Sequence, residues 1–227
     1  NLFIPDYGSK LTTSIYIRGI GSRINTPSVG LYVDNIPYID KSAFDFNYAD
    51  IERIDILRGP QGTLYGRNTM GGLIKIHTKS PFTYQGTDIR MGAATYNDYN
   101  VSLTHYHRIS DRFAFSTGGF YENAARNNER IDKSNAGGGR FRGIYLPTPN
   151  LKVDMTLSYE YSDQGGYPYK YTGVTEGEET RPEYIGKIAN NERSSYRRGL
   201  LNSGVNIEYQ ARTFILNAVT GYQNLND

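Results

Sequence analysis

The chain has 227 residues, with 25 lysines and arginines against 23 aspartates and glutamates, and it contains no cysteine. The formal charge of +2 gives no electrostatic reason to expect a nucleic acid partner, and the lack of cysteine excludes disulfides, thiolate metal sites and cysteine nucleophiles. No apolar run approaches the roughly 18–20 residues of a membrane-spanning helix, although a membrane β-barrel, whose pattern is weaker, stays open.

The N-terminal region predicts short strands punctuated by turn residues. Residues 14–19 and 29–35 are rich in β-formers and are bounded by Gly, Asn and Pro. Asp34 and Asn35 separate two apolar triplets, and they predict a tight turn because Asn tolerates positive φ.

Residues 50–81 predict one helical turn and two further strands. Asp50 stands where it can cap a short helical turn that leads into a strand. A last strand is expected in GGLIKIHTK, and it should stop at Ser80-Pro81. The region up to about residue 80 is therefore expected to be α+β.

From about residue 87 the pattern changes to long strands with period two. Between residues 151 and 162 every second residue is apolar, and the residues between them are polar or charged. A soluble sandwich and a membrane barrel both allow such alternation. The other strands are expected near residues 87–96, 98–108, 112–122, 139–147, 196–209 and 212–223.

The connections between these strands differ in length. Tight turns are expected at residues 110–112, 147–150 and 210–212, and long polar loops around 123–138 and 163–194. Short turns at one end and long loops at the other are typical of outer-membrane barrels, which the pattern favours over a soluble sandwich.

The stretch LRGPQGTLYGRNTMGG at residues 57–72 does not fit a nucleotide site. A phosphate-binding loop needs lysine after its last glycine, and Gly72 stands there instead. GIGSRI at residues 19–24 lacks the third glycine of a dinucleotide site. Glycines that permit tight turns explain both stretches better.

No catalytic or metal site can be assembled from the sequence. His105 and His107 share one face of a predicted strand, but no third ligand is visible nearby. No nucleophile with its base and no catalytic carboxylate pair is apparent, so we expect no enzyme activity, no metal and no cofactor.

Three motifs in order, IYIRGIG, VGLYVDNIPY and IERIDILRGPQGTLYGRNTMGGLIKIHTKSP, resemble the plug domain of TonB-dependent outer-membrane receptors. The wording LRGPQGTLYG is similar to that of siderophore-type receptors. Asn35 stands where the family usually has Gly, and LIKIHTK replaces a more usual xINIxTK. A turn Asn can adopt the left-handed conformation, so the first departure is tolerable.

The resemblance implies an α+β plug domain followed by antiparallel transmembrane β-barrel strands. We expect a partial plug at residues 1–80, a linker at 81–86 and the first part of the barrel at 87–227. Such receptors have 22 strands, and this chain would supply about seven. It also lacks the family's TonB box, so it is expected to be a piece of a longer protein.

The resemblance also implies roles for the plug residues. The arginines of IRG and LRGP pair with barrel carboxylates in the family and lock the plug, which carries over to Arg18 and Arg58. In our strand phasing Glu160 and Glu208 face the lumen and could serve as such carboxylates. The turn-rich plug motif carries over to Gly59, Pro60, Gly62, Tyr65, Gly66, Gly71 and Gly72.

The function implied is energy-coupled uptake of a scarce large solute, most simply a ferric siderophore, across the outer membrane of a Gram-negative bacterium. The implied partners are TonB of the inner-membrane TonB–ExbB–ExbD complex, outer-membrane lipid, the ligand and, as an accessory, a surface lipoprotein; nucleic acid is not among them. Apex loops in the family correspond to residues 21–27 and 38–46 here, which makes Arg23, Asn25, Tyr38 and Phe44 candidate ligand contacts.

Several alternatives stay open from the sequence. Within the same class the solute could be cobalamin, haem or an oligosaccharide. A passive or adhesive outer-membrane barrel is a different class, which would not need the plug motif. A soluble β-rich binding module, with residues 87–227 as a sandwich, is a third.

Overall fold

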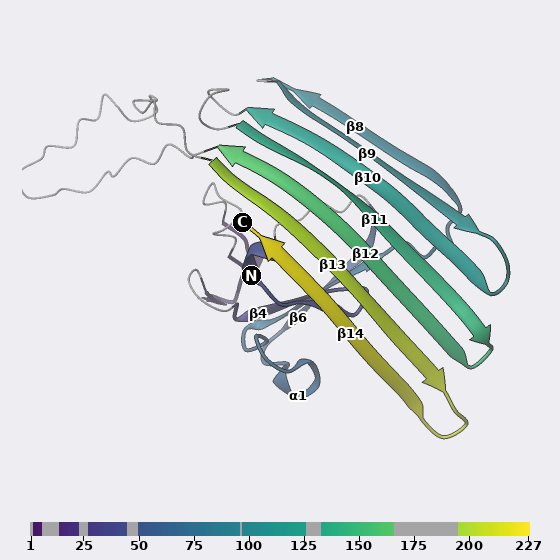
Figure 1. Ribbon diagram of the computed structural model, residues 1–227. Coiled ribbons are helices and arrows are strands. Elements are labelled where there is room, and N and C mark those ends of the chain that lie inside the picture. The colour runs from purple at the N-terminus through teal and green to yellow at the C-terminus, as the bar shows by residue number, and fades with distance from the viewer. Residues whose placement is uncertain are drawn as a thin grey trace, which may run out of the picture.

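The computed structural model describes residues 2–5, 14–22, 27–44, 50–95, 97–125, 133–165 and 195–227. They form two layers: a long curved sheet, and an N-terminal part that packs against one face of it (Figure 1). Within these ranges no helix is long and apolar enough to cross a membrane.

Seven antiparallel strands form the large sheet, which we call the wall. Each strand pairs with the next one along the chain, so the order across the wall is the order of the sequence. All the strands predicted after residue 86 are therefore confirmed. They are β8 (Gly86–Ala94), β9 (Asp98–Arg108), β10 (Phe113–Ala125), β11 (Lys133–Thr148), β12 (Leu151–Gly165), β13 (Ser195–Gln210) and β14 (Ile215–Asn226).

The two faces of the wall are of opposite character, as the alternation predicts. On β12, Leu157 and Tyr159 are 49% and 52% exposed on the outer face, whereas Asp154 and Glu160 are 4% and 6% exposed on the inner face. The inner face, where Arg198 is completely buried, packs against the N-terminal part. A sandwich would cover the apolar face instead, so this arrangement argues against that alternative.

The connections predicted to be short are short. β9 and β10, β11 and β12, and β13 and β14 are joined at residues 109–112, 149–150 and 211–214. The two long loops were predicted to be longer than they are. β10 and β12 continue to Ala125 and Gly165, because hydrogen bonds to the neighbouring strands hold the backbone extended there. Residues 126–132 and 166–194, the remainder of those loops, lie outside the described residues.

The N-terminal part holds two small sheets. β1 (Leu2–Phe3), β2 (Tyr16–Ile17) and β3 (Ile20–Gly21) form the first. The second has the order β5-β4-β7-β6, in which β4 and β7 are parallel. Its strands are β4 (Val29–Val33), β5 (Ile36–Tyr38), β6 (Ile51–Arg58) and β7 (Gly72–Thr78).

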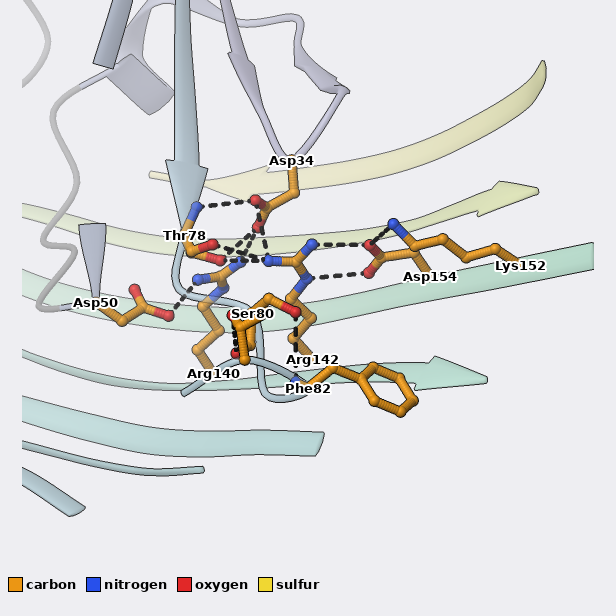
Figure 2. Close-up of polar contacts among 10 residues, drawn as sticks. Asp34, Asp50, Thr78, Ser80, Phe82, Arg140, Arg142, Lys152 and Asp154 are labelled. Carbon is orange, nitrogen blue, oxygen red and sulfur yellow. Dashed lines mark hydrogen bonds and ion pairs between the residues drawn. The ribbon is translucent and has the colours of Figure 1, made fainter. Parts of the chain in front are cut away.

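The tight turn predicted at Asp34 and Asn35 joins β4 to β5. Both residues have positive φ, 48° and 70°, as a two-residue hairpin turn of type I′ requires. Asn35 thus adopts the conformation for which the resemblance implies a glycine, and the turn directs the Asp34 side chain at the wall (Figure 2).

The helical turn predicted after Asp50 is wrong. Residues 51–58 form strand β6, because their β-branched isoleucines pair with β7 in an antiparallel ladder. The Asp50 carbonyl accepts a hydrogen bond from Lys79 N instead of starting a helix. The described N-terminal part contains only two short helical segments, the 3-10 turn η2 (Lys41–Phe44) and helix α1 (Gly62–Tyr65).

The hydrophobic core lies between the small sheets and the wall. Leu200 of β13 belongs to it, and Leu225 of β14 packs against it. Ile36 fits over two adjacent glycines of the wall, since a Cβ atom on Gly204 would lie 2.6 Å from the Ile36 side chain and one on Gly221 would lie 3.2 Å from it. The wall therefore supplies both apolar residues and space for the N-terminal part. The core residues are Ile15, Ile17, Val29, Leu31, Val33, Tyr38, Ala43, Phe44, Ile74, Ile76 and Leu200.

Candidate functional site

Two arginines of β11 reach from the wall into the N-terminal part. Arg140 and Arg142 lie two positions apart, so both side chains point from the inner face of the wall. They meet carboxylates and backbone groups at the β4–β5 turn and at the end of β7 (Figure 2). We call Asp34, Asp50, Thr78, Arg140, Arg142 and Asp154 the ion cluster.

Asp34 lies at the centre of the ion cluster. Its carboxylate accepts hydrogen bonds from Thr78 N at 2.9 Å and Thr78 Oγ1 at 2.7 Å. Arg140 Nη2 lies 2.5 Å from Asp34 Oδ2, and Arg142 Nη1 lies 3.2 Å from Asp34 Oδ1. One carboxylate therefore holds the end of β7 and both arginines of the wall.

Each arginine also binds a second carboxylate. Arg142 makes a two-pronged pair with Asp154 on β12, through Nε at 3.0 Å and Nη2 at 2.8 Å, and its Nη1 donates to the Thr78 carbonyl at 3.1 Å. Arg140 Nη1 lies 2.6 Å from Asp50 Oδ2. Such forked, buried geometry makes these pairs strong and directional.

The arginines determine the charge state of Asp34. Burial acts to raise the pKa of this carboxyl, but Arg142, Arg140 and the Thr78 hydrogen bonds outweigh burial and hold the pKa below the ordinary value of 3.8. Asp34 is therefore charged at neutral pH. Its ion pairs stabilise the contact between the two layers only while it stays charged.

The contact should weaken in acid. Because the folded pKa of Asp34 is lowered, its stabilising contribution is complete above the ordinary value of 3.8 and is lost as pH falls through it towards the folded pKa. Unfolding of the N-terminal part in the full-length protein, followed from about pH 6 to about pH 3, should show this loss. The Asp34→Asn variant should be less stable at neutral pH, and its stability should change less between about pH 6 and about pH 3 than that of the wild type. An equal loss of stability in acid for variant and wild type would contradict the role of Asp34.

The connection between the two layers is fastened separately. Lys79 Nζ lies 2.6 Å from Asp88 on β8 and 4.1 Å from the centre of the Tyr84 ring. The hydrogen bond to Asp88 raises the pKa of Lys79. Gln85 Oε1 accepts a hydrogen bond from Arg108 N at 2.8 Å. The segment after β7 is thus held against the first two strands of the wall.

A small cavity lies beside the ion cluster, between the N-terminal part and the wall. Its volume is about 50 Å³, and its lining includes Asp50, Arg140, Ser116, Ser158, Glu160 and Asn202. On the wall Glu160 forms a buried ion pair with Arg198 Nη2. The lining of the cavity thus includes charged groups from both layers.

Comparison with known proteins identifies the N-terminal part. Residues 2–73 match the family model described as the TonB-dependent receptor plug domain. The first third of this chain is therefore similar to a TonB-dependent receptor plug. The resemblance stated for residues 14–81 is thereby confirmed up to residue 73.

The chain is also similar to named receptors and transporters. The chain is 35% identical over 118 residues to the pesticin receptor of Yersinia pestis, covering 51% of this chain and 17% of that protein. It is 28% identical over 124 residues to the vitamin B12 transporter BtuB of Vibrio vulnificus, covering 49% and 18%. The chain thus spans less than a fifth of the length of these relatives.

Solved structures show the same fold over nearly the whole chain. The ferric yersiniabactin uptake receptor FyuA of Yersinia pestis matches 99% of this chain and 36% of its own, with a TM-score of 0.80 and 21% identity. The ferripyoverdine receptor of the Pseudomonas aeruginosa outer membrane matches 87% and 27%, with a TM-score of 0.61 and 17% identity. The arrangement of the strands in this chain is therefore shared with these structures.

The two arginines predicted to lock the plug lie elsewhere. Arg18 and Arg58 are exposed, and no ion pair between described residues involves either of them. Arg18 occupies a turn with φ of 54° between β2 and β3, and Arg58 ends β6. The locking role of these two arginines stays a prediction.

The structure describes two of the four candidate ligand contacts. Arg23 and Asn25 lie outside the described residues. Tyr38 and Phe44 belong to the hydrophobic core, 7% and 9% exposed, and Tyr38 also lines the cavity. Their observed role is packing between plug and wall, and a ligand role stays a prediction.

The plug motif forms a closed loop between β6 and β7. Backbone hydrogen bonds join Gly59 to Gly71 and Gln61 to Thr69, and α1 lies inside the loop. Tyr65 packs edge-on against Tyr32, with ring centres 5.3 Å apart. This stretch is therefore turn-rich, as predicted from its glycines in place of a phosphate-binding loop. The motif residues are Gly59, Pro60, Gly62, Tyr65, Gly66, Gly71 and Gly72.

Sequence reasoning missed the residues that join the two layers. It sought plug arginines and wall carboxylates, whereas the ion cluster joins plug carboxylates, Asp34 and Asp50, to wall arginines. A signal was present: Arg140 and Arg142 occupy successive inward positions of a predicted strand. Glu160 does face inward as phased, but it pairs with Arg198 of the wall.

Proposed function

We propose that this protein is an energy-coupled outer-membrane receptor that imports a scarce large solute, most simply a ferric siderophore, in a Gram-negative bacterium. One observation carries the proposal: a plug packs on the polar face of a wall whose other face is apolar. A water-filled lumen closed by a plug and a lipid-facing exterior account for both faces.

The solute class is supported by the names of similar proteins. The matching structures include receptors for ferric yersiniabactin and ferripyoverdine, and one described as a siderophore receptor. The vitamin B12 transporters among the relatives favour cobalamin as a second candidate. These names describe receptors and transporters, which supports a protein that binds and moves its solute without converting it.

The remaining parts of the assembly are also proposed. The wall strands would belong to a 22-stranded barrel, since an open sheet edge in lipid leaves backbone groups unsatisfied. The plug would occupy residues 1–80, a linker 81–86 and the barrel strands 87–227. TonB of the TonB–ExbB–ExbD complex, outer-membrane lipid and a surface lipoprotein are the proposed partners. Arg23, Asn25, Tyr38 and Phe44 are the proposed ligand contacts; Tyr38 and Phe44 would be reached only when the plug moves.

Uptake by the full-length receptor tests the function. Cells that express it should accumulate iron from a panel of ferric siderophores, and deletion of TonB should abolish accumulation while surface binding is retained. Cyanocobalamin serves as the competing substrate. Accumulation without TonB would indicate a passive barrel, and recovery in the soluble fraction without detergent would contradict a membrane receptor.

We further propose that Arg58, with Arg18, pairs with barrel carboxylates outside this chain and helps to lock the plug. Arg58→Glu should then raise the passive entry of large antibiotics, because a like-charge contact replaces an ion pair. Arg67→Glu, an exposed change in the same loop, is the matched control. Equal antibiotic sensitivity of the two variants would remove the locking role.

A further inference from the structure

Arg140 and Glu160 line the same small cavity from adjacent strands of the wall. In the structure Arg140 binds the plug carboxylates Asp34 and Asp50, while Glu160 binds Arg198. A plug carboxylate, Asp50, and a wall carboxylate, Glu160, thus line the same cavity as Arg140.

The register of the wall places Glu160 within reach of Arg140. Arg140 lies opposite Ser158, and Glu160 is two positions farther along β12. Long side chains span such diagonal positions. The same two strands already hold one pair of this kind, because Arg142 lies opposite Thr156 and binds Asp154, two positions away in the other direction.

We propose that Arg140 is a transfer residue: when the plug leaves the wall, its guanidinium moves from Asp34 and Asp50 through the cavity to Glu160. The inference rests on the proposed function, in which the plug must move for solute to pass. It adds a means of opening built into the wall itself.

The exchange lowers the cost of separating the two layers. Withdrawing Asp34 and Asp50 removes two counter-charges from Arg140 before water has filled the space, and the loss of counter-charges from a buried charge is costly. Glu160 offers a replacement counter-charge, since it is a carboxylate of the neighbouring strand and a carboxylate accepts several hydrogen bonds at once. Separation then becomes an exchange of partners.

Two variants that break the same wall ion pair test the transfer. Glu160→Gln removes the negative charge that receives Arg140 and should slow separation about tenfold, whereas Arg198→Gln removes the cation that competes with Arg140 for Glu160 and should speed separation. If Glu160 served only to neutralise Arg198, both variants would shift the rate in the same direction. Opposite shifts support the transfer, and shifts of the same sign, or none, overturn it.

Separation can be measured by labelling a cysteine placed in the cavity. This chain has no cysteine, and Ser116 is 3% exposed at the cavity, so Ser116→Cys in the full-length receptor should react with a soluble maleimide only after the plug moves. Labelling in isolated membranes under mild urea needs no uptake. Absence of transport would therefore contradict the proposed function, whereas the labelling rates would still test the transfer of Arg140.

A structure gives a second, independent readout. In the full-length receptor carrying Asp34→Asn and Asp50→Asn, the Arg140 guanidinium should lie within hydrogen-bond distance of the Glu160 carboxylate. Arg140 still directed at positions 34 and 50 would overturn the proposal, even where the kinetic variants fold poorly.

Discussion

Arg142→Ala is expected to destabilise the contact between plug and wall by about 3–5 kcal/mol, because it removes the counter-charge that two buried carboxylates share. Asp34 and Asp154 have side chains only 3% and 4% exposed. Arg142 also donates to the carbonyl and hydroxyl of Thr78, so the end of β7 loses its tie to the wall. Urea unfolding of the purified full-length receptor in detergent measures the loss.

Two further variants separate geometry from charge. Arg142→Lys keeps the charge but loses the two-pronged contact with Asp154, and it should fall between wild type and Arg142→Ala. Lys152→Ala is the matched control: its side chain is 40% exposed, and its Nζ lies 3.7 Å from Asp154. That change should cost less than about 1 kcal/mol. An Arg142→Ala variant no less stable than Lys152→Ala would refute the importance of the ion cluster.

Gly72→Ala is expected to disrupt the plug, with a loss of about 4 kcal/mol from strain and overpacking together. Gly72 has φ of 146°, and an added Cβ atom would lie 2.4 Å from the Leu57 carbonyl oxygen and 2.9 Å from Ile17 Cδ1. Those atoms belong to β6 and to the core, so they cannot move aside cheaply. Thermal unfolding and limited proteolysis of the plug would both report the change.

Gly62→Ala is the control for Gly72→Ala. Gly62 is the first residue of α1, and the nearest atom to an added Cβ, Thr69 Oγ1, is 4.0 Å away. Alanine is the better helix former, so stability should stay the same or rise by up to about 1 kcal/mol. Similar losses for the two variants would contradict the structural reason given for Gly72.

The alternation of apolar and polar residues with a period of two made the wall predictable from the sequence. Residues 151–162 alternate without a break, and in a strand that alternation assigns each residue to a face without knowledge of the rest of the fold. The Asp34–Asn35 turn was predictable for a similar reason, since few residues other than glycine and asparagine adopt its conformation readily. Both features depend on local chemistry alone.

The ion cluster could not be derived in the same way. Asp34 and Arg140 are separated by 106 positions in the sequence, and which charges meet depends on how the plug sits on the wall. Asp50 looked like a helix cap because its local sequence fits one, yet pairing of β6 with β7 decided its structure. Long-range docking overrode local preference at both sites.

The contact between the start and the end of this chain has a consequence for the order of biosynthesis. Gln223 Oε1 accepts hydrogen bonds from the backbone amides of Ile39 and Asp40, at 3.2 and 2.9 Å. During synthesis, residues 39 and 40 emerge long before β14. The hydrogen bonds that hold the end of β5 against the wall can therefore form only after more than 180 further residues have been made. During that interval the apolar residues of the unfinished core stay exposed, and an exposed apolar surface promotes aggregation.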